Sequence, residues 1–394
     1  GGLVGYTNGT VTASTASGAV SGRVFVGGLV GSAGSPAMIN RSSASGNVSA
    51  RQGFAGGLVG YLEGTVERST ASGDIEATAS RVGGLVGFAR SESSITRSNA
   101  SGAVSGTDDV GGLVGFSEED SVINSSNSSG VVSADDHVGG LVGYTNGTVT
   151  ASTASGAVSG SSYVGGLVGS TGQYSIINRS NATGTVSGEK NVGGLVGADY
   201  GAVNTSYAIG GVTGGQYVGG LIGFVDGTVE DTYAAPTAAI HGDEHVGGLI
   251  GYIDDTGRVN RSFATGLVNA TGSKSGGIRF NSPGAVSDSY WNTETTNQSA
   301  SDGGIPLTTV QMTGDDALES MSGLDDTVWS TVDESTAGSS GDGYPVLAAL
   351  PLDPQILVPT RENDSTDEGG SSDSSGSTDE GGSSDSSGST DEGG

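Results

Sequence analysis

The chain has 394 residues, of which 75 are glycine and only 33% are hydrophobic, so a thick conventional globular core is not expected. Fourteen Lys and Arg against 43 Asp and Glu give a formal net charge of -29, which argues against binding to nucleic acid or to anionic membranes. The chain has no cysteine, which excludes disulfides and thiolate chemistry, and no run of about 18 apolar residues that would span a membrane.

A repeat begins at residue 1. The sequence Gly-Gly-Leu, then Val or Ile, then Gly recurs at intervals of 26 to 29 residues, starting at Gly1, Gly27, Gly56, Gly83, Gly111, Gly139, Gly165, Gly193, Gly219 and Gly247. A degraded eleventh copy begins at Gly276. Residues 1–22 recur letter for letter at 139–160, which indicates that a block of five units was duplicated. Because the chain opens inside a repeat, we expect it to be a fragment of a longer protein.

Each unit predicts three short strands separated by corners. The first surrounds Gly-Gly-Leu-Val-Gly, the second holds a Val or Ile, and the third begins at a row of hydroxyl residues. In the third strand Ser14, Ala16, Gly18 and Val20 are two residues apart, so the small side chains share one face. We therefore expect residues 1–280 to form an all-β parallel β-helix, or β-solenoid, of about ten coils.

The corners leave one assignment open. Leu and the residue after it are apolar in every unit, yet adjacent strand residues point to opposite faces. Either a corner lies at the paired glycines, or one apolar row lies outside and is covered; we favour the corner. Variable corners are expected at the Gly-, Asn- and Asp-rich positions, such as residues 107–109 and 134–136.

The periodicity fails after Gly277, and residues 281–350 are expected to form a C-terminal capping segment. Residues 307–321 have the character of one or two helical turns, which Gly314 weakens. One outward row changes along the chain, from Thr15, Ser43, Thr70 and Asn99 to Tyr207, Tyr233, Phe263 and Tyr290. Outward aromatic residues in the last coils predict that residues 295–350 fold back over them.

Residues 351–394 are expected to be a disordered, low-complexity acidic linker or stalk. The phrase STDEGGSSDSSG repeats from Ser365, and residues 361–394 hold ten acidic residues against one Arg. A spacer toward the cell envelope is favoured over a merely solubilising tail.

These residues resemble a known family. The recurring Gly-Leu-Val-Gly and its Ser-x-Ala-x-Gly-x-Val continuation are similar to the GLUG repeats of large bacterial and archaeal surface proteins. The segment SYWNTETTNQSASDGGIPLTTVQM at 289–312, with Trp329 and the YPVL at 344–347, resembles the segment that closes such arrays. The resemblance covers about residues 1–350 and implies an adhesin-like surface protein. GLUG repeats also lie outside the catalytic part of some IgA-cleaving metallopeptidases, which would imply a companion enzyme domain elsewhere.

Candidate metal chemistry is sparse, and we predict no resident metal or cofactor. His241 and His245 resemble a ligand pair but do not form H-E-x-x-H, and no third ligand is evident. His245 aligns with other residues that precede Val-Gly-Gly, which indicates an ordinary variable corner. The acidic corners at 118–120 and 254–255 would bind calcium at most weakly, because neither has the spaced carboxylates of a calcium loop.

No catalytic site is predicted. Enzymes on β-helices need paired carboxylates that interrupt the repeat, whereas deviations here are scattered and mostly Ser, Thr, Asn or Gly. An outward row of arginines more plausibly offsets neighbouring acids such as Glu67: Arg41, Arg68, Arg97, Arg179 and Arg261. Ice binding through flat Thr and Ser rows is disfavoured because the outward rows mix Asn, Arg and Glu.

The acceptor pattern for N-glycosylation, Asn-x-Ser/Thr, is frequent. It occurs at Asn8, Asn40, Asn47, Asn99, Asn124, Asn127, Asn146, Asn178, Asn181, Asn204, Asn260 and Asn269, and again at Asn297 and Asn363. Several of these positions are expected on the outward face, which fits a glycoprotein.

We therefore expect a non-catalytic extracellular rod on a cell surface, structural or adhesive, whose repeats set its length and present outward Ser, Thr and Asn faces. The alternative is a non-catalytic repeat region of a secreted peptidase or polysaccharide-degrading enzyme. Expected partners are the cell envelope or other cells, through glycans or self-association, and not nucleic acid. The acid-rich, lysine-poor composition favours a salt-loving archaeon as the source, because high salt screens charge repulsion.

Overall fold

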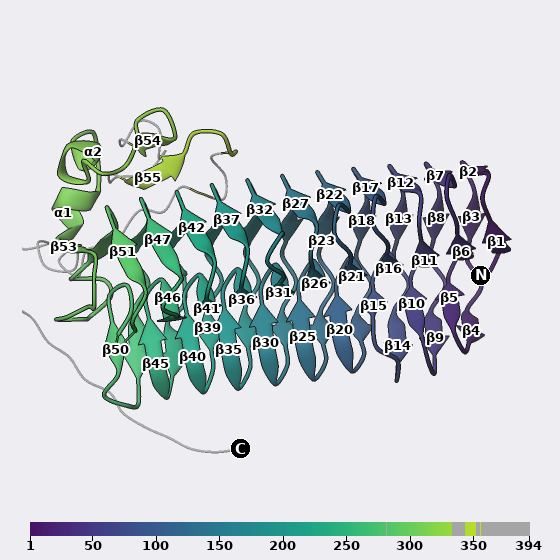
Figure 1. Ribbon diagram of the computed structural model, residues 1–394, viewed down its shortest axis with the longest axis horizontal. Helices are drawn as coiled ribbons and strands as arrows, with labels where there is room; N and C mark the ends of the chain where they lie inside the picture. Colours follow the sequence, from purple (N-terminus) through teal and green to yellow (C-terminus); the bar gives the residue numbers. More distant parts are fainter. Residues whose placement is uncertain (281, 333–342, 352–354, 356–394) are drawn as a thin grey trace, which may run out of the picture. The chain divides into compact units, whose positions relative to one another are not determined.

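Ten coils stack in register to form a parallel β-solenoid (Figure 1). The computed structural model describes residues 1–280, 282–332, 343–351 and 355. The chain divides into two units, residues 1–359 and 360–394, and the second lies outside the described residues. The predicted fold class is confirmed, whereas the predicted acidic linker at 351–394 falls almost wholly outside the part that the structure describes.

Each coil contains five short strands, so the prediction of three strands was wrong. The equivalent strands of successive coils pair in parallel and build five sheets, A to E, that run along the stack. Two of the predicted strands are each divided by a bend at glycine: one at Gly28 and Leu29, the other around Gly18. The pairing joins like with like, for example Val59 with Val86 and Ala71 with Ala100.

Sheet A takes the strand that follows each Gly-Gly-Leu: β1 (Val4–Thr7), β6 (Val30–Ala33), β11 (Val59–Leu62), β16 (Val86–Ala89), β21 (Val114–Ser117), β26 (Val142–Thr145), β31 (Val168–Thr171), β36 (Val196–Asp199), β41 (Ile222–Val225) and β46 (Ile250–Ile253). Sheet B takes the next strand: β2 (Thr10–Thr12), β7 (Met38–Asn40), β12 (Thr65–Glu67), β17 (Ser94–Thr96), β22 (Val122–Asn124), β27 (Thr148–Thr150), β32 (Ile176–Asn178), β37 (Ala202–Asn204), β42 (Thr228–Glu230), β47 (Arg258–Asn260) and β51 (Ala285–Ser287).

Sheet C follows the hydroxyl row: β3 (Thr15–Ala16), β8 (Ser43–Ala44), β13 (Thr70–Ala71), β18 (Asn99–Ala100), β23 (Asn127–Ser128), β28 (Thr153–Ala154), β33 (Asn181–Ala182), β38 (Tyr207–Ala208), β43 (Tyr233–Ala234), β48 (Phe263–Ala264), β52 (Tyr290–Asn292) and β53 (Ile305–Leu307). Sheet D comes next: β4 (Val20–Gly22), β9 (Val48–Ala50), β14 (Ile75–Ala77), β19 (Val104–Ser105), β24 (Val132–Ser133), β29 (Val158–Ser159), β34 (Val186–Ser187), β39 (Val212–Thr213), β44 (Ile240–Gly242) and β49 (Val268–Ala270).

Sheet E closes each coil and leads into the next pair of glycines: β5 (Phe25–Gly27), β10 (Phe54–Gly56), β15 (Val82–Gly83), β20 (Asp108–Gly111), β25 (Asp136–Gly139), β30 (Ser162–Gly165), β35 (Lys190–Gly193), β40 (Gln216–Gly219), β45 (Glu244–Gly247) and β50 (Ser275–Gly276). Asp108, Asp136 and His245 therefore belong to strands, whereas the sequence predicted corners for them. The bend lies just before each strand, for example at Thr107.

The interior of each coil is divided into two lobes by a narrow waist. One apolar cluster, which includes Leu85 and Val86, lies among sheets A, B and C, and a second, which includes Val82, lies between sheets D and E. The second glycine of each pair lies at the waist: a Cβ atom on Gly84 would be 2.9 Å from Ala100 Cβ and 2.0 Å from the carbonyl oxygen of Gly112. The corner at the glycines is thus confirmed, and both apolar rows are buried inside.

The invariant hydroxyl row forms a hydrogen-bond ladder along the stack. The backbone N–H of Ser98 donates to Ser126 Oγ (3.2 Å), and Ser126 Oγ donates to the carbonyl oxygen of Asn124 (2.9 Å). The same pair of bonds recurs in most coils. Through its bond to the carbonyl oxygen two residues earlier, each hydroxyl spans the single residue that precedes it. That preceding residue has a left-handed φ between 43° and 52° in every unit: Ala13, Arg41, Arg68, Arg97, Ser125, Ala151, Arg179, Thr205, Asp231, Arg261 and Asp288.

A segment after the last coil packs over the aromatic row of sheet C. It contains the one-turn helices α1 (Thr309–Met312) and α2 (Ala317–Ser320), on either side of Gly314, and the antiparallel pair β54 (Trp329–Val332) and β55 (Gly343–Leu347). The Trp329 ring lies 5.4 Å from that of Phe263 and 6.0 Å from that of Tyr233. The aromatic row is therefore covered, and burial raises the pKa of the Tyr344 hydroxyl to about 12.

Two residues close the C-terminal end of the larger lobe. The Trp291 ring is buried in the A–B–C cluster, where it occupies the space that the Ala row fills in earlier coils. Arg279 replaces the apolar residue of the degraded repeat and donates hydrogen bonds to the carbonyl oxygens of Ser282 and, at 2.7 Å, Gly284. Burial lowers the pKa of this guanidinium. The end of the stack is thus covered by a ring and by a donor for its carbonyl groups.

The hydroxyl ladder predicts a specific loss of stability. Ser126→Ala would leave the buried N–H of Ser98 without its acceptor, so we expect the free energy of unfolding to fall by roughly 1–3 kcal/mol. Urea unfolding followed by far-UV circular dichroism measures the change, with Ser129→Ala on the exposed face of the same coil as the control. Equal losses in the two variants would show that the ladder has no special role.

Candidate functional site

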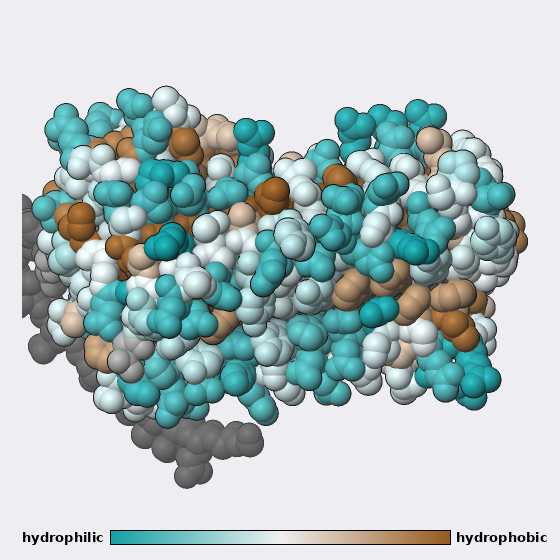
Figure 2. All heavy atoms as spheres, viewed as in Figure 1, coloured by the Kyte–Doolittle hydropathy of each residue, from teal (hydrophilic) through white to brown (hydrophobic). Residues whose placement is uncertain are grey.

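An aromatic seam runs along the outside of the stack, where sheets A and E meet at the glycine bend. Sheet A contributes Tyr61, Phe88, Phe116 and Tyr144, in register on successive strands, and sheet E contributes Phe54. Phe88 is only 5% exposed, and the other four are half-buried. Apolar surface shows as a tan and brown band over this part of the coils in Figure 2.

The rings of the seam stack on one another. Phe54 lies 4.8 Å from Phe88, Phe88 lies 5.4 Å from Phe116, and Phe116 lies 5.0 Å from Tyr144, with interplanar angles of 16° or less. The guanidinium of Arg81 covers three rings, with its Cζ 4.5 Å from the Phe116 centroid. Cation–π contact and stacking both stabilise such an arrangement. The seam is therefore an ordered surface with ring edges directed outward.

Arg81 also begins a short charged chain along sheet E. Its Nε lies 3.6 Å from one Asp109 carboxylate oxygen, and His137 Nδ1 lies 3.2 Å from the other. Arg81 immediately precedes β15, Asp109 and His137 occupy the equivalent position in β20 and β25, and all three have left-handed φ. Asp109 therefore neutralises Arg81, and the chain joins the aromatic seam to the polar face of sheet E.

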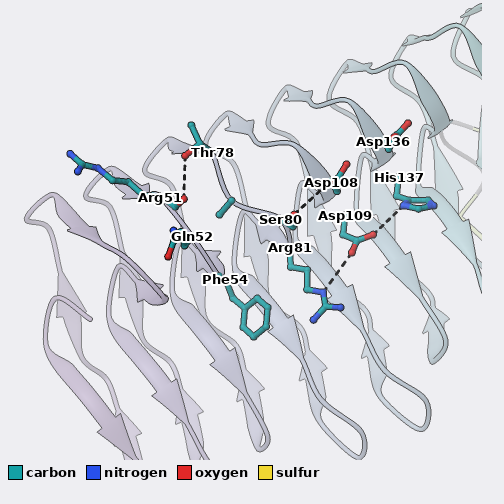
Figure 3. Close-up of a pocket in the computed structure, with 12 residues that line it drawn as sticks. Arg51, Gln52, Phe54, Thr78, Ser80, Arg81, Asp108, Asp109, Asp136 and His137 are labelled. Carbon is teal, nitrogen blue, oxygen red and sulfur yellow. Dashed lines mark hydrogen bonds and ion pairs between the residues drawn. The ribbon is translucent and has the colours of Figure 1, made fainter.

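A shallow depression of about 590 Å³ opens beside this chain (Figure 3). Coils are numbered here from the repeat that begins at Gly1, so coil 3 comprises residues 56–82. The depression forms because coil 3 carries small residues at 78–80. Arg51 and Gln52 of coil 2 line one side of it, and Asp108 and Asp136 of coils 4 and 5 line the other. Ser80 Oγ donates a 3.4 Å hydrogen bond to Asp108. In Figure 3 the Arg51 side chain points along the surface, away from Asp108, so donors and acceptors are spread over several coils. Such an open site suits hydrogen bonding to an extended ligand.

This site was not predicted from the sequence. His137, Tyr163 and His245 all precede Val-Gly-Gly, a position that was interpreted as a variable corner. The signal was the recurrence of aromatic residues at two positions of the unit, the one before Val-Gly-Gly and the one after Leu-Val-Gly. A second aromatic stretch, with Tyr217, Phe224 and Tyr252, lies at the same positions in later coils.

The structure places the predicted metal candidates apart from this depression. His241 is exposed on β44, whereas His245 is 7% exposed on β45 and packs against Tyr217 and Tyr252. Burial lowers the pKa of the His245 imidazole. The acidic corners at 118–120 and 254–255 lie at turns after β21 and β46. Among the described residues, no three His, Asp or Glu side chains converge as metal ligands.

The recurrent arginines behave as surface ion-pair partners where acids lie near. Glu67 pairs with Arg68 at 2.7 Å and with Arg97 at 3.5 Å. Arg261 pairs with Glu230 at 3.2 Å and Asp231 at 2.8 Å. Their pairing follows the sequence-based interpretation.

The predicted glycosylation acceptors differ in accessibility. Six are exposed: Asn8, Asn47, Asn99, Asn127, Asn269 and Asn297, whereas Asn363 lies outside the described residues. Six are half-buried: Asn40, Asn124, Asn146, Asn178, Asn204 and Asn260. Asn181 is 9% exposed, so its side chain is the least open to modification. Occupancy at all of them stays a prediction.

One titratable group lies wholly inside the larger lobe. Asp199 ends β36 and accepts hydrogen bonds from Thr171 Oγ1 (2.8 Å) and from the backbone N–H of Gly201 (3.2 Å). Its second carboxylate oxygen is buried without a hydrogen-bond partner, and burial raises the pKa of the carboxyl from 3.8 to about 6. The next coil carries Val225 at this position.

Fold and repeats together define a repeat-based structural protein, a β-solenoid. Family comparison identifies the GLUG motif at residues 55–76, 78–105 and 160–187, and each match is about as long as one coil. Comparisons with curated proteins and with solved structures found no match. In the described residues no helix has the length and apolar character needed to cross a membrane.

Asp199 predicts an unusual dependence of stability on pH. The folded protein holds this proton more tightly than the unfolded chain, so its contribution to stability is full below about pH 4 and is lost as the pH rises through about 6. Asp199→Asn removes the titration, and we expect it to be more stable than the parent at pH 8 by roughly 2–3 kcal/mol. Urea unfolding at pH 4 to 8 measures both proteins. A difference that does not change with pH would contradict the assignment.

Proposed function

We propose that the chain is a non-catalytic, extracellular cell-surface rod with a structural or adhesive role. The observation that carries this proposal is the unbroken register of five sheets over ten coils, because whole coils can be added without disturbing the interior. The outward rows of Ser, Thr and Asn and the GLUG motifs support a structural role at a surface.

A surface-shaving experiment tests this role. Intact cells that produce the full-length protein are treated with a protease and probed with an antibody against residues 139–192. We expect the antibody to label untreated cells and the signal to disappear after treatment. Recovery of the epitope in the medium, joined to a peptidase or polysaccharide-degrading domain, would support the secreted-enzyme alternative instead.

We also propose that the protein works at high salt, as in a salt-loving archaeon. This proposal is supported by the composition, because the chain has 43 acidic residues and only 14 Lys and Arg. Only two of these 14 are lysine, Lys190 and Lys274. Screening of this repulsion should raise the midpoint of thermal unfolding between about 0.1 and 3 M salt, by several degrees or more. Far-UV circular dichroism of residues 1–360 measures it. A midpoint that does not respond to salt would remove the argument.

A further inference from the structure

Charge is distributed unevenly along the chain. Residues 1–100 hold seven arginines and five acidic residues, a net charge of +2. Residues 101–280 hold six basic and 16 acidic residues, a net charge of -10. A densely charged anionic partner is therefore repelled by the later coils, whereas an isolated anionic group is tolerated by the first ones.

The aromatic seam of Phe54, Tyr61, Phe88, Phe116 and Tyr144 begins in this region of positive charge. Four of its rings are half-buried, which leaves an apolar strip across coils 2 to 6. The strip repeats once per coil, at about 4.8 Å. Because the same contact recurs at a constant spacing, the strip is suited to a partner that is itself a regular polymer.

Two charged side chains beside the seam lack an ion-pair partner in the part of the chain that the structure describes. Within the described residues, the Arg51 guanidinium has neither an ion pair nor a side-chain hydrogen bond, and Asp136 has no ion pair. Arg51 and Asp136 lie on different coils at opposite ends of the depression (Figure 3). One end thus offers a cationic donor, and the other offers carboxylate acceptors at Asp108 and Asp136.

We propose that the seam and the depression bind an extended polysaccharide, with carboxylates on only some of its sugars, along coils 2 to 6. Arg51 pairs with a carboxylate of the polysaccharide, and Asp108 and Asp136 accept hydrogen bonds from its hydroxyl groups. The aromatic side chains of the seam contact the apolar C–H faces of the sugar rings. This inference rests on the proposed surface role and names the class of ligand.

The arrangement selects against other polyanions. A nucleic acid carries a negative charge at every nucleotide, and the carboxylates of Asp108 and Asp136 would oppose it. An acidic peptide carries carboxylates but lacks the dense hydroxyl donors that would satisfy these acceptors. A polysaccharide with occasional carboxylates supplies both groups.

Isothermal titration of the full chain, at a salt concentration at which far-UV circular dichroism shows it folded, tests the proposal with three probes. These are polygalacturonate with about half of its carboxylates methyl-esterified, so that charged sugars are spaced apart, the same polymer fully methyl-esterified, and poly-glutamate. We expect the half-esterified polymer to bind, the fully esterified polymer to bind at least tenfold more weakly, and poly-glutamate to bind no better than the fully esterified polymer.

Two variants and two matched controls locate the site. Arg51→Gln and Phe54→Ala should each weaken binding of the half-esterified polymer by roughly fivefold to tenfold. Arg179→Gln removes the same charge from the corner row, and Tyr252→Ala removes a ring from the later aromatic stretch, so both should bind like the parent. Unfolding midpoints of all four variants show whether each is folded.

Equal binding of the fully and the half-esterified polymers, or stronger binding of poly-glutamate, would overturn the proposal, and so would equal effects of the site and control variants. Failure to bind any probe would also overturn it. Surface labelling that persists alongside such a failure would leave the proposed surface role standing and refute only the ligand class.

Discussion

The close approach of backbone at the paired glycines is the constraint on which the rest of the coil depends. A side chain at Gly84 would collide with the facing Ala row and with the next coil. Because both glycines lack one, the chain can cross the waist, and Val82 enters one lobe while Leu85 enters the other. Apolar residues, mainly Val, Leu, Ile and Ala, thus fill the narrow interior on both sides. The same bend brings sheets A and E together on the outside and creates the aromatic seam.

The corner before sheet C shows how an invariant interior allows a variable surface. The buried serine hydroxyl donates a hydrogen bond across the left-handed residue to the carbonyl oxygen before it. This bond stabilises the left-handed conformation, so the residue does not need to be glycine. Arg, Asp, Ala, Ser and Thr all occupy this position in different coils. Charge can therefore change from coil to coil without loss of register, which explains how a basic beginning and an acidic continuation share one fold.

The repeat period, the parallel stacking, the row of small residues on one strand face and the cover over Tyr233 and Phe263 could all be predicted, because each leaves a row of like residues in the sequence. The number of strands per coil could not, since the bends depend on contacts with neighbouring coils. The seam was missed for a related reason. Phe54 and Phe88 are 34 residues apart, and only the waist brings their rings within 4.8 Å. The burial of Asp199 could not be predicted from the residues next to it in the sequence. It depends on the position of Asp199 in β36, which is equivalent to that of the buried Val225 in the next coil.

The direction of the hydrogen bonds has a mechanical consequence. Strands of adjacent coils are joined by bonds that run along the stack, so tension between its two ends loads the outermost coil first and opens its bonds in sequence. A folded coil spans about 5 Å of the stack. Once released, its 26 to 29 residues extend to roughly 90 Å. Under load the stack would therefore lengthen in discrete steps and shorten again one coil at a time.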